Sequence, residues 1–198
     1  MEIVLASRNR KKIEELKSLL ADMPVEVRSL ADFPDVPETP ETGNTFAENA
    51  ELKAKAAAES TGRIALADDS GLEVDALEGQ PGILSNRFAG PDATDQDKYM
   101  RILELLEGVP DEERTARFRA AVAVATPEGE TVLVEGTCEG RIAREPRGEN
   151  GFGYDPIFYL PDLGLTMAEL PSQKKNRISH RAKALQSAKK VLGQLPSI

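Results

Sequence analysis

The sequence of 198 residues has little cysteine, histidine or tryptophan, with one, one and none respectively. Its single cysteine, Cys138, cannot form an internal disulfide or a cysteine cluster for zinc, which fits a reducing cytoplasm. The longest uninterrupted apolar run is Ala120 to Ala125, far short of the roughly 20 residues that a membrane-spanning helix needs. The N-terminus also lacks a signal-peptide pattern, because charge follows its short apolar stretch rather than preceding it. We therefore expect a cytoplasmic protein with no membrane partner.

The sequence also lacks an excess of basic residues. It has 25 Lys and Arg against 34 Asp and Glu, for a net charge of −9, which argues against a nucleic-acid partner. The charges are unevenly distributed, however: residues 1–12 carry a net +3, residues 172–198 carry +7, and the segment between them carries −19. Two interpretations fit the basic ends. They are solvated surface charges, or they converge on an anionic ligand.

Apolar runs and turn residues predict an alternation of strands and helices. With 40% hydrophobic residues, the chain has the composition of one compact domain or of two tightly fused lobes. The predicted strands cover residues 2–7, 25–30, 64–67, 115–125 and 131–143. The predicted helices follow residue 12, run from 45 to about 62 and from 94 to 107, and begin again after Ser179. Strands and helices alternate in the first half of the chain, and a hairpin follows. This order favours an α/β protein with a mixed sheet and helices on its faces.

Asp68 and Asp69 are the strongest local signal for chemistry. They come directly after the predicted strand 64–67, and ligands of open α/β sheets bind at the carboxyl ends of strands. Two carboxylates there supply the hard oxygen ligands that Mg²⁺ prefers, with phosphate oxygens and water completing its shell. Because side chains alternate along the backbone, the two are not expected to coordinate one ion equally. The alternative is an ordinary turn, which Asp, Ser and Gly all favour.

The segment Ser7-x-Asn9-x-x-Lys12 lies between the first predicted strand and the first predicted helix. A helix N-terminus after a strand presents backbone N–H groups to a phosphate. The alternative is a plain turn with a helix cap and solvent-facing lysines. No Gly-x4-Gly-Lys-Ser/Thr motif occurs anywhere in the sequence, so ATP hydrolysis by the P-loop design is excluded.

Two segments near the C-terminus carry further candidates. In Gly151-Phe-Gly-Tyr-Asp155, the glycines allow a close approach to a ligand and Phe152 or Tyr154 could stack on a base, although a strand entry with core aromatics is the alternative. The segment 174–181 ends in His180 and Arg181, whose side-chain donors suit a carbonyl or phosphate oxygen. The alternative is that the two residues simply begin a capped surface helix. Covalent catalysis has little support, because no Ser-His-Asp arrangement is evident and Cys138 lies mid-strand.

A set of short motifs occurs in order along nearly the whole chain and is specific as a set. Its members are Val4-Leu-Ala-Ser-x-Asn-x-x-Lys12, Glu41-Thr-Gly-x-Thr-Phe46, Asn49-Ala50, Ala67-Asp-Asp-Ser-Gly-Leu72, Pro81-Gly82, Arg87-Phe88, Gly151-Phe-Gly-Tyr-Asp-Pro-Ile-Phe158, Ala168-Glu-Leu170 and Ile178-Ser-His-Arg181. Together they resemble the inosine triphosphate pyrophosphatase family. The resemblance implies a homodimeric, Mg²⁺-dependent enzyme that hydrolyses ITP, dITP and XTP to the monophosphate and pyrophosphate. It also implies an elongated mixed sheet flanked by helices, residues 1–198 forming one domain of two lobes with the active-site cleft between them.

The resemblance also implies roles for individual residues. Asp69 would bind Mg²⁺ and accept a proton, and Ser70 would touch the nucleotide. The groups expected to hold the triphosphate are Ser7, Arg8, Asn9, Arg10, Lys11, Lys12 and Lys53. The base and sugar pocket would be formed by Phe152, Gly153, Tyr154, Asp155, Lys175, His180 and Arg181.

The sequence departs from the family pattern next to the second expected metal ligand. Many relatives carry a further acidic residue before Glu41-Thr-Gly43, where this chain has Pro40. Glu41 is the expected ligand, with Glu38 and Asp68 as the alternatives. Ser7 stands where many relatives have Thr and keeps the hydroxyl. Two other functions compete: a nucleotide-binding protein without catalysis, and a Maf-like pyrophosphatase acting on pyrimidine nucleotides.

Overall fold

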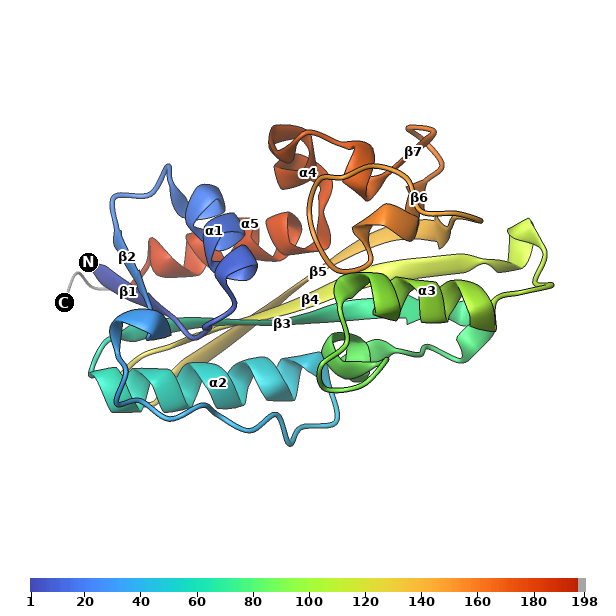
Figure 1. Ribbon diagram of the computed structural model, residues 1–198. Helices are drawn as coiled ribbons and strands as arrows, with labels where there is room; N and C mark the ends of the chain where they lie inside the picture. The colour runs from blue at the N-terminus through green and yellow to red at the C-terminus, as the bar shows by residue number, and fades with distance from the viewer. Residues whose placement is uncertain (196–198) are drawn as a thin grey trace. The chain divides into compact units, whose positions relative to one another are not determined.

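The computed structural model describes residues 1–195, and its strands form one seven-stranded mixed sheet in the order β2-β1-β3-β4-β5-β6-β7 (Figure 1). The strands are β1 (Glu2–Leu5), β2 (Glu26–Ser29), β3 (Ile64–Val74), β4 (Thr115–Ala125), β5 (Thr131–Ile142), β6 (Phe158–Leu160) and β7 (Leu165–Thr166). The helices are α1 (Arg10–Leu20), α2 (Phe46–Thr61), α3 (Asp95–Leu105), α4 (Ser172–Ile178) and α5 (His180–Leu192). Within this part of the chain, no helix is both long enough and apolar enough to span a bilayer.

The chain divides into two compact units. The first comprises residues 1–69, 120–136 and 181–198, and the second comprises residues 70–119 and 137–180. The long strands β3, β4 and β5 therefore each contribute residues to both units. The predicted α/β class with a mixed sheet and flanking helices is confirmed. That residues 1–198 form one domain of two lobes, with a cleft between them, stays a prediction.

The first unit is built on a parallel arrangement. β1 pairs in parallel with both β2 and β3, while α1 and α5 lie on one face of the sheet and α2 on the other (Figure 1). Leu16 and Leu20 of α1 pack with Leu185 of α5 against Ile3 and Leu66 of the sheet, and all five side chains are buried. This packing fixes the start of α1 beside the end of β1.

The second unit has its own apolar core. Phe158 and Ile157, which follow the glycine-rich loop, pack with Ile102 and Leu106 from the α3 region and with Met167. The strands β5, β6 and β7 are antiparallel neighbours, with Arg141 opposite Tyr159 and Tyr159 opposite Thr166. The segment after β5 is thereby held against this core.

The prediction that a strand ends at Ala67 was wrong. β3 continues through Asp68 and Asp69 to Val74 and is buried along almost its full length. The turn preference of Asp, Ser and Gly is overridden because cationic groups neutralise the buried carboxylates, as described below. The parallel partner β1 does end here, since its last paired residue, Leu5, lies opposite Leu66. The carboxyl end that positions the acids is therefore that of β1.

Other boundaries differ from prediction in smaller ways. The spacing of Thr45 and Glu48 predicts a capping box at the start of α2. Thr45 does cap this helix, but Glu48 accepts a hydrogen bond from the Asn44 N–H rather than from Thr45. The helical spacing of Tyr99, Met100, Leu103 and Leu106 predicts that they face inward, but in α3 Met100 is exposed and Ile102 is the buried residue. The basic segment 174–181 forms α4 and the start of α5, with Ser179 in extended conformation between them.

Candidate active site

Asp68 lies at the centre of a buried ionic cluster in the first unit. Its Oδ2 is 3.1 Å from Lys12 Nζ and 3.2 Å from Arg181 Nη2, and its Oδ1 accepts from Arg181 Nε at 3.3 Å. Burial alone would raise the pKa of Asp68, but Arg181 and Lys12 hold it well below its usual range. Asp68 is therefore an ionised anchor whose two oxygens bind cations of the protein.

The next residue of β3 faces a second cluster. Lys53 of α2 donates to Asp69 Oδ1 and to Glu41 Oε1, both at 2.9 Å, and to the Asp68 carbonyl at 3.0 Å. Residue alternation along β3 thus gives the two aspartates different partners, while their unequal coordination of a metal ion stays a prediction. Lys53 brings Asp69 and Glu41 to one ammonium group, although they are far apart in sequence.

The pKa values of this second cluster move apart. Burial raises the pKa of the Asp69 carboxyl, and Glu41 adds to this effect against the opposing influence of Lys53. Burial would also raise the pKa of Glu41, but Lys53 outweighs it and lowers that pKa. Two carboxyl groups with diverging proton affinities in one site are typical of acid–base chemistry.

Glu41 is held in place through its own loop. The Gly43 N–H donates to Oδ1 of the buried Asn49 on α2 at 2.8 Å. A Cβ added to Gly43 would come within 2.6 Å of the Glu48 Cβ and 2.8 Å of Asn49 Oδ1. Glycine at this position is therefore what allows the loop to approach α2. Glu38, by contrast, is exposed.

The segment between β1 and α1 is ordered largely by its own side chains. Asn9 caps α1, its Oδ1 accepting from the N–H groups of Lys11 and Lys12 at 3.1 and 3.3 Å. The Asn9 N–H in turn donates to Ser7 Oγ. Two of the N–H groups that we expected to face a phosphate are thus occupied in this structure. The helix N-terminus is a capped turn here, and the buried ammonium of Lys12 is its principal charge near Asp68.

The remaining cations of this segment point elsewhere. Arg8 donates to the carbonyl oxygens of Leu30 and Val36, which ties it to the loop after β2. Arg10 is 91% exposed and pairs with Glu14 one turn along α1. Lys11 is also exposed. Of the predicted triphosphate-binding groups, the structure therefore brings only Lys12 and Lys53 to the two aspartates.

A third cluster lies in the second unit, on the glycine-rich loop. Asp155 Oδ2 accepts from Lys175 Nζ at 2.7 Å and from the Phe152 N–H at 3.0 Å. Lys175 Nζ also lies 4.9 Å from the centre of the Phe152 ring. Gly151 has a φ of 74°, and a Cβ there would collide with the Asp155 carboxylate. The loop conformation therefore depends on glycine, and it presents Phe152 beside a buried ammonium group.

Other residues predicted to bind the nucleotide pack against apolar groups or form hydrogen bonds within the protein. Tyr154 is buried and donates from its hydroxyl to the Ser85 carbonyl at 2.8 Å, so Phe152 is the better placed of the two for stacking. His180 is buried and stacks on Phe118, with ring centres 4.7 Å apart. The Gly153 N–H donates to Asp95 at 2.9 Å. Ser70 is buried on β3 directly after Asp69.

Arg181 belongs with the Asp68 cluster rather than with the base-pocket residues to which we had assigned it. Besides Asp68, its Nη1 donates to Glu15 Oε2 at 2.9 Å. Sequence reasoning missed Glu15, which looks like one of several acidic residues on an amphipathic helix. It also missed Asp95 and left Asn49 without a role. Only the position of Asn49 within a family motif could have indicated its importance.

Comparison with known proteins shows the family to which the chain belongs. A model of the Ham1 family matches residues 3–191, and the chain belongs to this family. It is 54% identical to a dITP/XTP pyrophosphatase of Desulforamulus reducens, over 98% of this chain and 97% of that protein. It is 58% identical to a dITP/XTP pyrophosphatase of Geobacillus kaustophilus, over 93% of this chain and 90% of that protein.

Solved structures show the same fold. A HAM1 protein from Coxiella burnetii matches with a TM-score of 0.89 and 47% identity, covering 98% of this chain and 100% of that chain. The Ham1 protein of Staphylococcus aureus matches with a TM-score of 0.86 and 43% identity, covering 98% of each chain. The family and fold predicted from the ordered motifs are therefore confirmed. The roles of individual site residues stay predictions.

Proposed function

We propose that this chain hydrolyses deaminated purine nucleoside triphosphates (dITP, ITP and XTP) to the monophosphate and pyrophosphate. Its relatives in Desulforamulus reducens and Geobacillus kaustophilus bear the name dITP/XTP pyrophosphatase and match it over most of their length. The observation that carries the proposal is the Lys53 ammonium group, bound at 2.9 Å by both Asp69 and Glu41 in a largely buried site. Such a site combines an acid–base pair with cationic charge suited to phosphates.

The donor set fits Mg²⁺ as the cofactor. Asp69 and Glu41 would hold the ion, because they supply hard oxygen ligands that Lys53 brings together, each through one of its two oxygens. Within residues 1–195, no group of three or more His, Cys, Asp or Glu side chains is placed to hold a metal ion, so water and substrate phosphate oxygens would have to complete the shell of an ion held by these two carboxylates. When bound, the ion would neutralise charge on the phosphates and favour a nucleophilic water. Asp68 does not fit as a ligand, because Lys12 and Arg181 occupy both of its oxygens.

Different residues of the site then contribute to a single displacement at the α-phosphorus. A water oxygen forms a bond to the α-phosphorus while the bond from that phosphorus to the pyrophosphate oxygen breaks. The water proton passes to the Asp69 carboxylate, whose raised pKa suits a proton acceptor. Lys53 and Lys12 stabilise the charge that develops on the leaving pyrophosphate. No covalent intermediate with the protein is needed.

Recognition of the base fits the chemistry of the glycine-rich loop. Hypoxanthine and xanthine present an acceptor oxygen at C6, whereas adenine presents a donor amine there. The Phe152 ring offers a stacking surface and Lys175 offers a buried cationic donor beside it. The Lys175 ammonium group already donates to Asp155, and facing an amine would leave a further donor hydrogen of this group without an acceptor, which costs roughly 1–3 kcal/mol per contact. Rejection of ATP by orders of magnitude therefore needs more than one such contact.

A homodimer and a cytoplasmic location are further parts of this proposal.

A panel of nucleotides tests the proposed function. We expect Mg²⁺-dependent pyrophosphate release from ITP, dITP and XTP, with far slower release from ATP, and none in the presence of EDTA. Preferential turnover of dTTP or UTP would instead support the Maf-like alternative. Binding of ITP without release of pyrophosphate would support a nucleotide-binding protein without catalysis. Comparable turnover of ATP and ITP at equal concentration would refute the specificity part of the proposal.

A further inference from the structure

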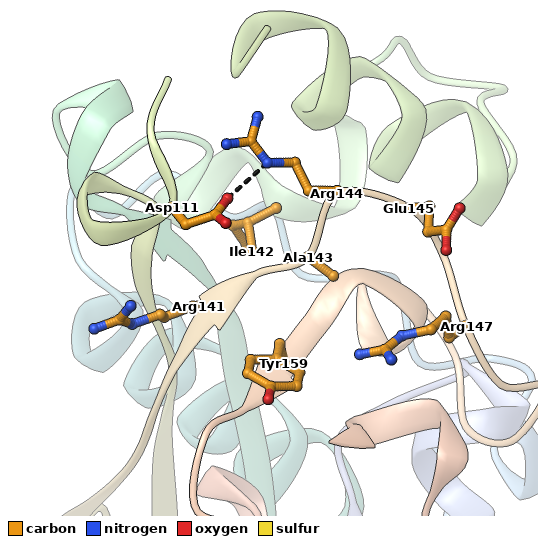
Figure 2. A pocket seen from close by; sticks show the side chains of 8 residues that line it. All are labelled: Asp111, Arg141, Ile142, Ala143, Arg144, Glu145, Arg147 and Tyr159. Carbon is orange, nitrogen blue, oxygen red and sulfur yellow. Dashed lines mark hydrogen bonds and ion pairs between the residues drawn. The ribbon is translucent and has the colours of Figure 1, made fainter. Parts of the chain in front are cut away.

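A pocket of about 460 Å³ opens in the second unit around the segment that follows β5 (Figure 2). It is lined by three arginines, two acids, one tyrosine and two apolar residues, namely Asp111, Arg141, Ile142, Ala143, Arg144, Glu145, Arg147 and Tyr159. None of these residues takes part in the reaction proposed above. The pocket is therefore a feature that the proposed function leaves unexplained.

The segment that lines this pocket is hydrogen-bonded to a buried positive charge. Arg114 is buried, with 2% of its surface exposed, and donates to the carbonyl oxygens of Ile142 and Ala143 at 2.9 Å each. A third bond at 2.9 Å joins it to the Leu106 carbonyl. All three hydrogen-bond acceptors are thus neutral, and burial together with nearby Arg144 lowers the pKa of Arg114 against the opposing influence of Asp111. Buried charges are normally paired, and the one acid that acts on Arg114, Asp111, is shared with Arg144, so this region can accommodate a further anion.

The arginines that line the pocket are only partly neutralised. Arg144 pairs with Asp111 at 2.6 Å, as the dashed line in Figure 2 marks. Arg147 lies 3.8 Å from a Glu169 oxygen, and its guanidinium sits 5.6 Å from the centre of the Tyr159 ring. Arg141 is exposed and makes no ion pair within residues 1–195. Among the described residues, Arg141 is thus the one lining arginine without an ion pair, and the Arg147 pair is long.

The aromatic ring lies among these cations. Arg141 and Tyr159 are directly opposite each other across the β5–β6 ladder, and Figure 2 shows Tyr159 between Arg141 and Arg147. Guanidinium groups match phosphate oxygens in two-point hydrogen bonds, and tyrosine rings accept flat ligands. The pocket volume exceeds the need of inorganic phosphate and falls within the range of small-molecule sites.

We propose that this pocket binds a phosphorylated small molecule of about nucleotide size, with Arg141 and Arg147 holding the phosphate and Tyr159 contacting the organic part. The site is separate from the proposed active site, and the inference would stand if the proposed activity failed. The acidic character of the chain as a whole favours a small anion over a nucleic acid as the occupant.

The absence of tryptophan allows a site-specific test. A Y159W variant places the only indole of the chain in the pocket and keeps a ring beside Arg147. Its fluorescence is followed during titration with inosine monophosphate, inorganic phosphate or inosine, in EDTA so that no turnover occurs. We expect a saturable change with inosine monophosphate, a weaker affinity for inorganic phosphate, and no change with inosine. Equal affinity for the two phosphates would overturn the nucleotide-sized assignment, and no response to either would overturn the site.

Arginine variants in the Y159W background locate the phosphate contacts. R141A/R147A should weaken the affinity for inosine monophosphate on the order of 100-fold, because each charge-assisted contact is worth about tenfold or more. R101A, which removes an exposed arginine paired with Glu104 on α3, should leave the titration unchanged. Unchanged affinity in R141A/R147A would refute the proposal, and R141A alone provides the same test if the double variant does not fold. Turnover of dITP by R141A/R147A should match that of the unmutated protein, which separates this site from the active site.

Discussion

Acidic residues on strand β3 and directly after it lie in two very different settings. In the first unit, Asp68 is 2% exposed and binds Lys12 and Arg181, while neighbouring Asp69 binds Lys53. In the second unit, Asp75 lies at the end of the same β-rich stretch with a side chain that is 43% exposed, and it pairs with Arg117. Both settings contain carboxylates and cations at hydrogen-bonding distance. They differ in access to water.

Because of that difference, loss of a partner lowers the free energy of unfolding much more for the buried charges than for the exposed ones. Removing one member of a buried ion pair leaves the other uncompensated, which costs about 3–5 kcal/mol. Exposed pairs are screened and contribute about 0.2–1 kcal/mol. The Asp75 cluster, with Glu73, Arg119 and Glu139 also in contact, is therefore a surface network. The buried cluster has the environment in which charge affects both folding and chemistry.

The largest effect is expected for Asp69→Asn. The amide cannot accept the proton of the attacking water and is a weaker metal ligand, so turnover of dITP should fall at least on the order of 1,000-fold, in line with a loss of general base and metal contact together. The fold should remain intact, as checked by circular dichroism and urea unfolding. Substantial Mg²⁺-dependent pyrophosphate release by this variant would refute the assignment of Asp69.

Glu73→Gln provides the matched control for this variant on the same strand. Glu73 contacts Arg117 and Arg119 at 3.9 and 3.5 Å in the exposed network. Its amide variant should retain full activity, and its free energy of unfolding should change by less than about 0.5 kcal/mol. A loss of activity in Glu73→Gln similar to that of Asp69→Asn would mean that charge on β3 in general, rather than Asp69 itself, is required.

The next largest effect is expected for Asp68→Asn, this time on stability. The change leaves the buried cations Lys12 and Arg181 without their shared counter-ion, so the free energy of unfolding should fall by about 3–5 kcal/mol. Urea unfolding at pH 7 measures this directly. A change below about 1 kcal/mol would mean that water reaches the cluster and that the contrast with the exposed network does not hold.

The sequence allowed the family and the mixed sheet to be predicted, and it singled out Asp68 and Asp69 as candidates for chemistry. It did not reveal the side chains that these two aspartates bind. Short motifs report local geometry, so the cap at Asn9 and the loop at Gly151 were recognisable as turns before helices or strands. The continuation of β3 through Asp68 was not, because it depends on cations from residues 12 and 181. The local preference of these residues for a turn conflicts here with ion pairs to residues distant in sequence. The ion pairs prevail, and they form only in the folded chain.

Arg181 illustrates the same limit in another way. Its neighbour His180 stacks on Phe118 in the second unit, whereas Arg181 pairs with Glu15 and Asp68 in the first. The sequence places the two side by side and suggested one shared role. Successive residues at the start of a helix point in different directions, so adjacency along the chain did not predict adjacency of side chains.

A smaller effect is expected where the buried cluster meets its loop. Gly43→Ala adds a Cβ that would meet the Glu48 Cβ at 2.6 Å and disturb the bond to Asn49. Glu41, two residues earlier, should then be held less well, so the Mg²⁺ concentration for half-maximal activity should rise by about tenfold, as when groups supporting metal ligands are lost. Direct Mg²⁺ titration by calorimetry checks binding apart from turnover.

Gly129→Ala is a suitable glycine control in the first unit. Gly129 lies in the β4–β5 turn, and a Cβ there would meet no atom within 4 Å, although its φ of 94° makes the substitution strained. It should lower stability without changing the Mg²⁺ requirement. If Gly43→Ala behaved in the same way, Gly43 would serve folding alone and Glu41 would not depend on its loop for position.

The smallest effect is expected for Asp75→Asn in the exposed network. Hydrogen bonds from Arg117 and Thr115 lower the pKa of Asp75 below its ordinary value of 3.8. The ionised form is therefore favoured in the folded protein, and its contribution is present above the unfolded pKa and is lost as the pH falls through the folded one. Asp75→Asn should lower the free energy of unfolding by about 0.2–1 kcal/mol at pH 7, less in high salt. Urea unfolding from pH 7 down to pH 3 should show the two proteins converging at the acidic end. A difference that is independent of pH and salt would indicate lost packing rather than lost charge, and would place this network closer to the buried cluster than its exposure suggests.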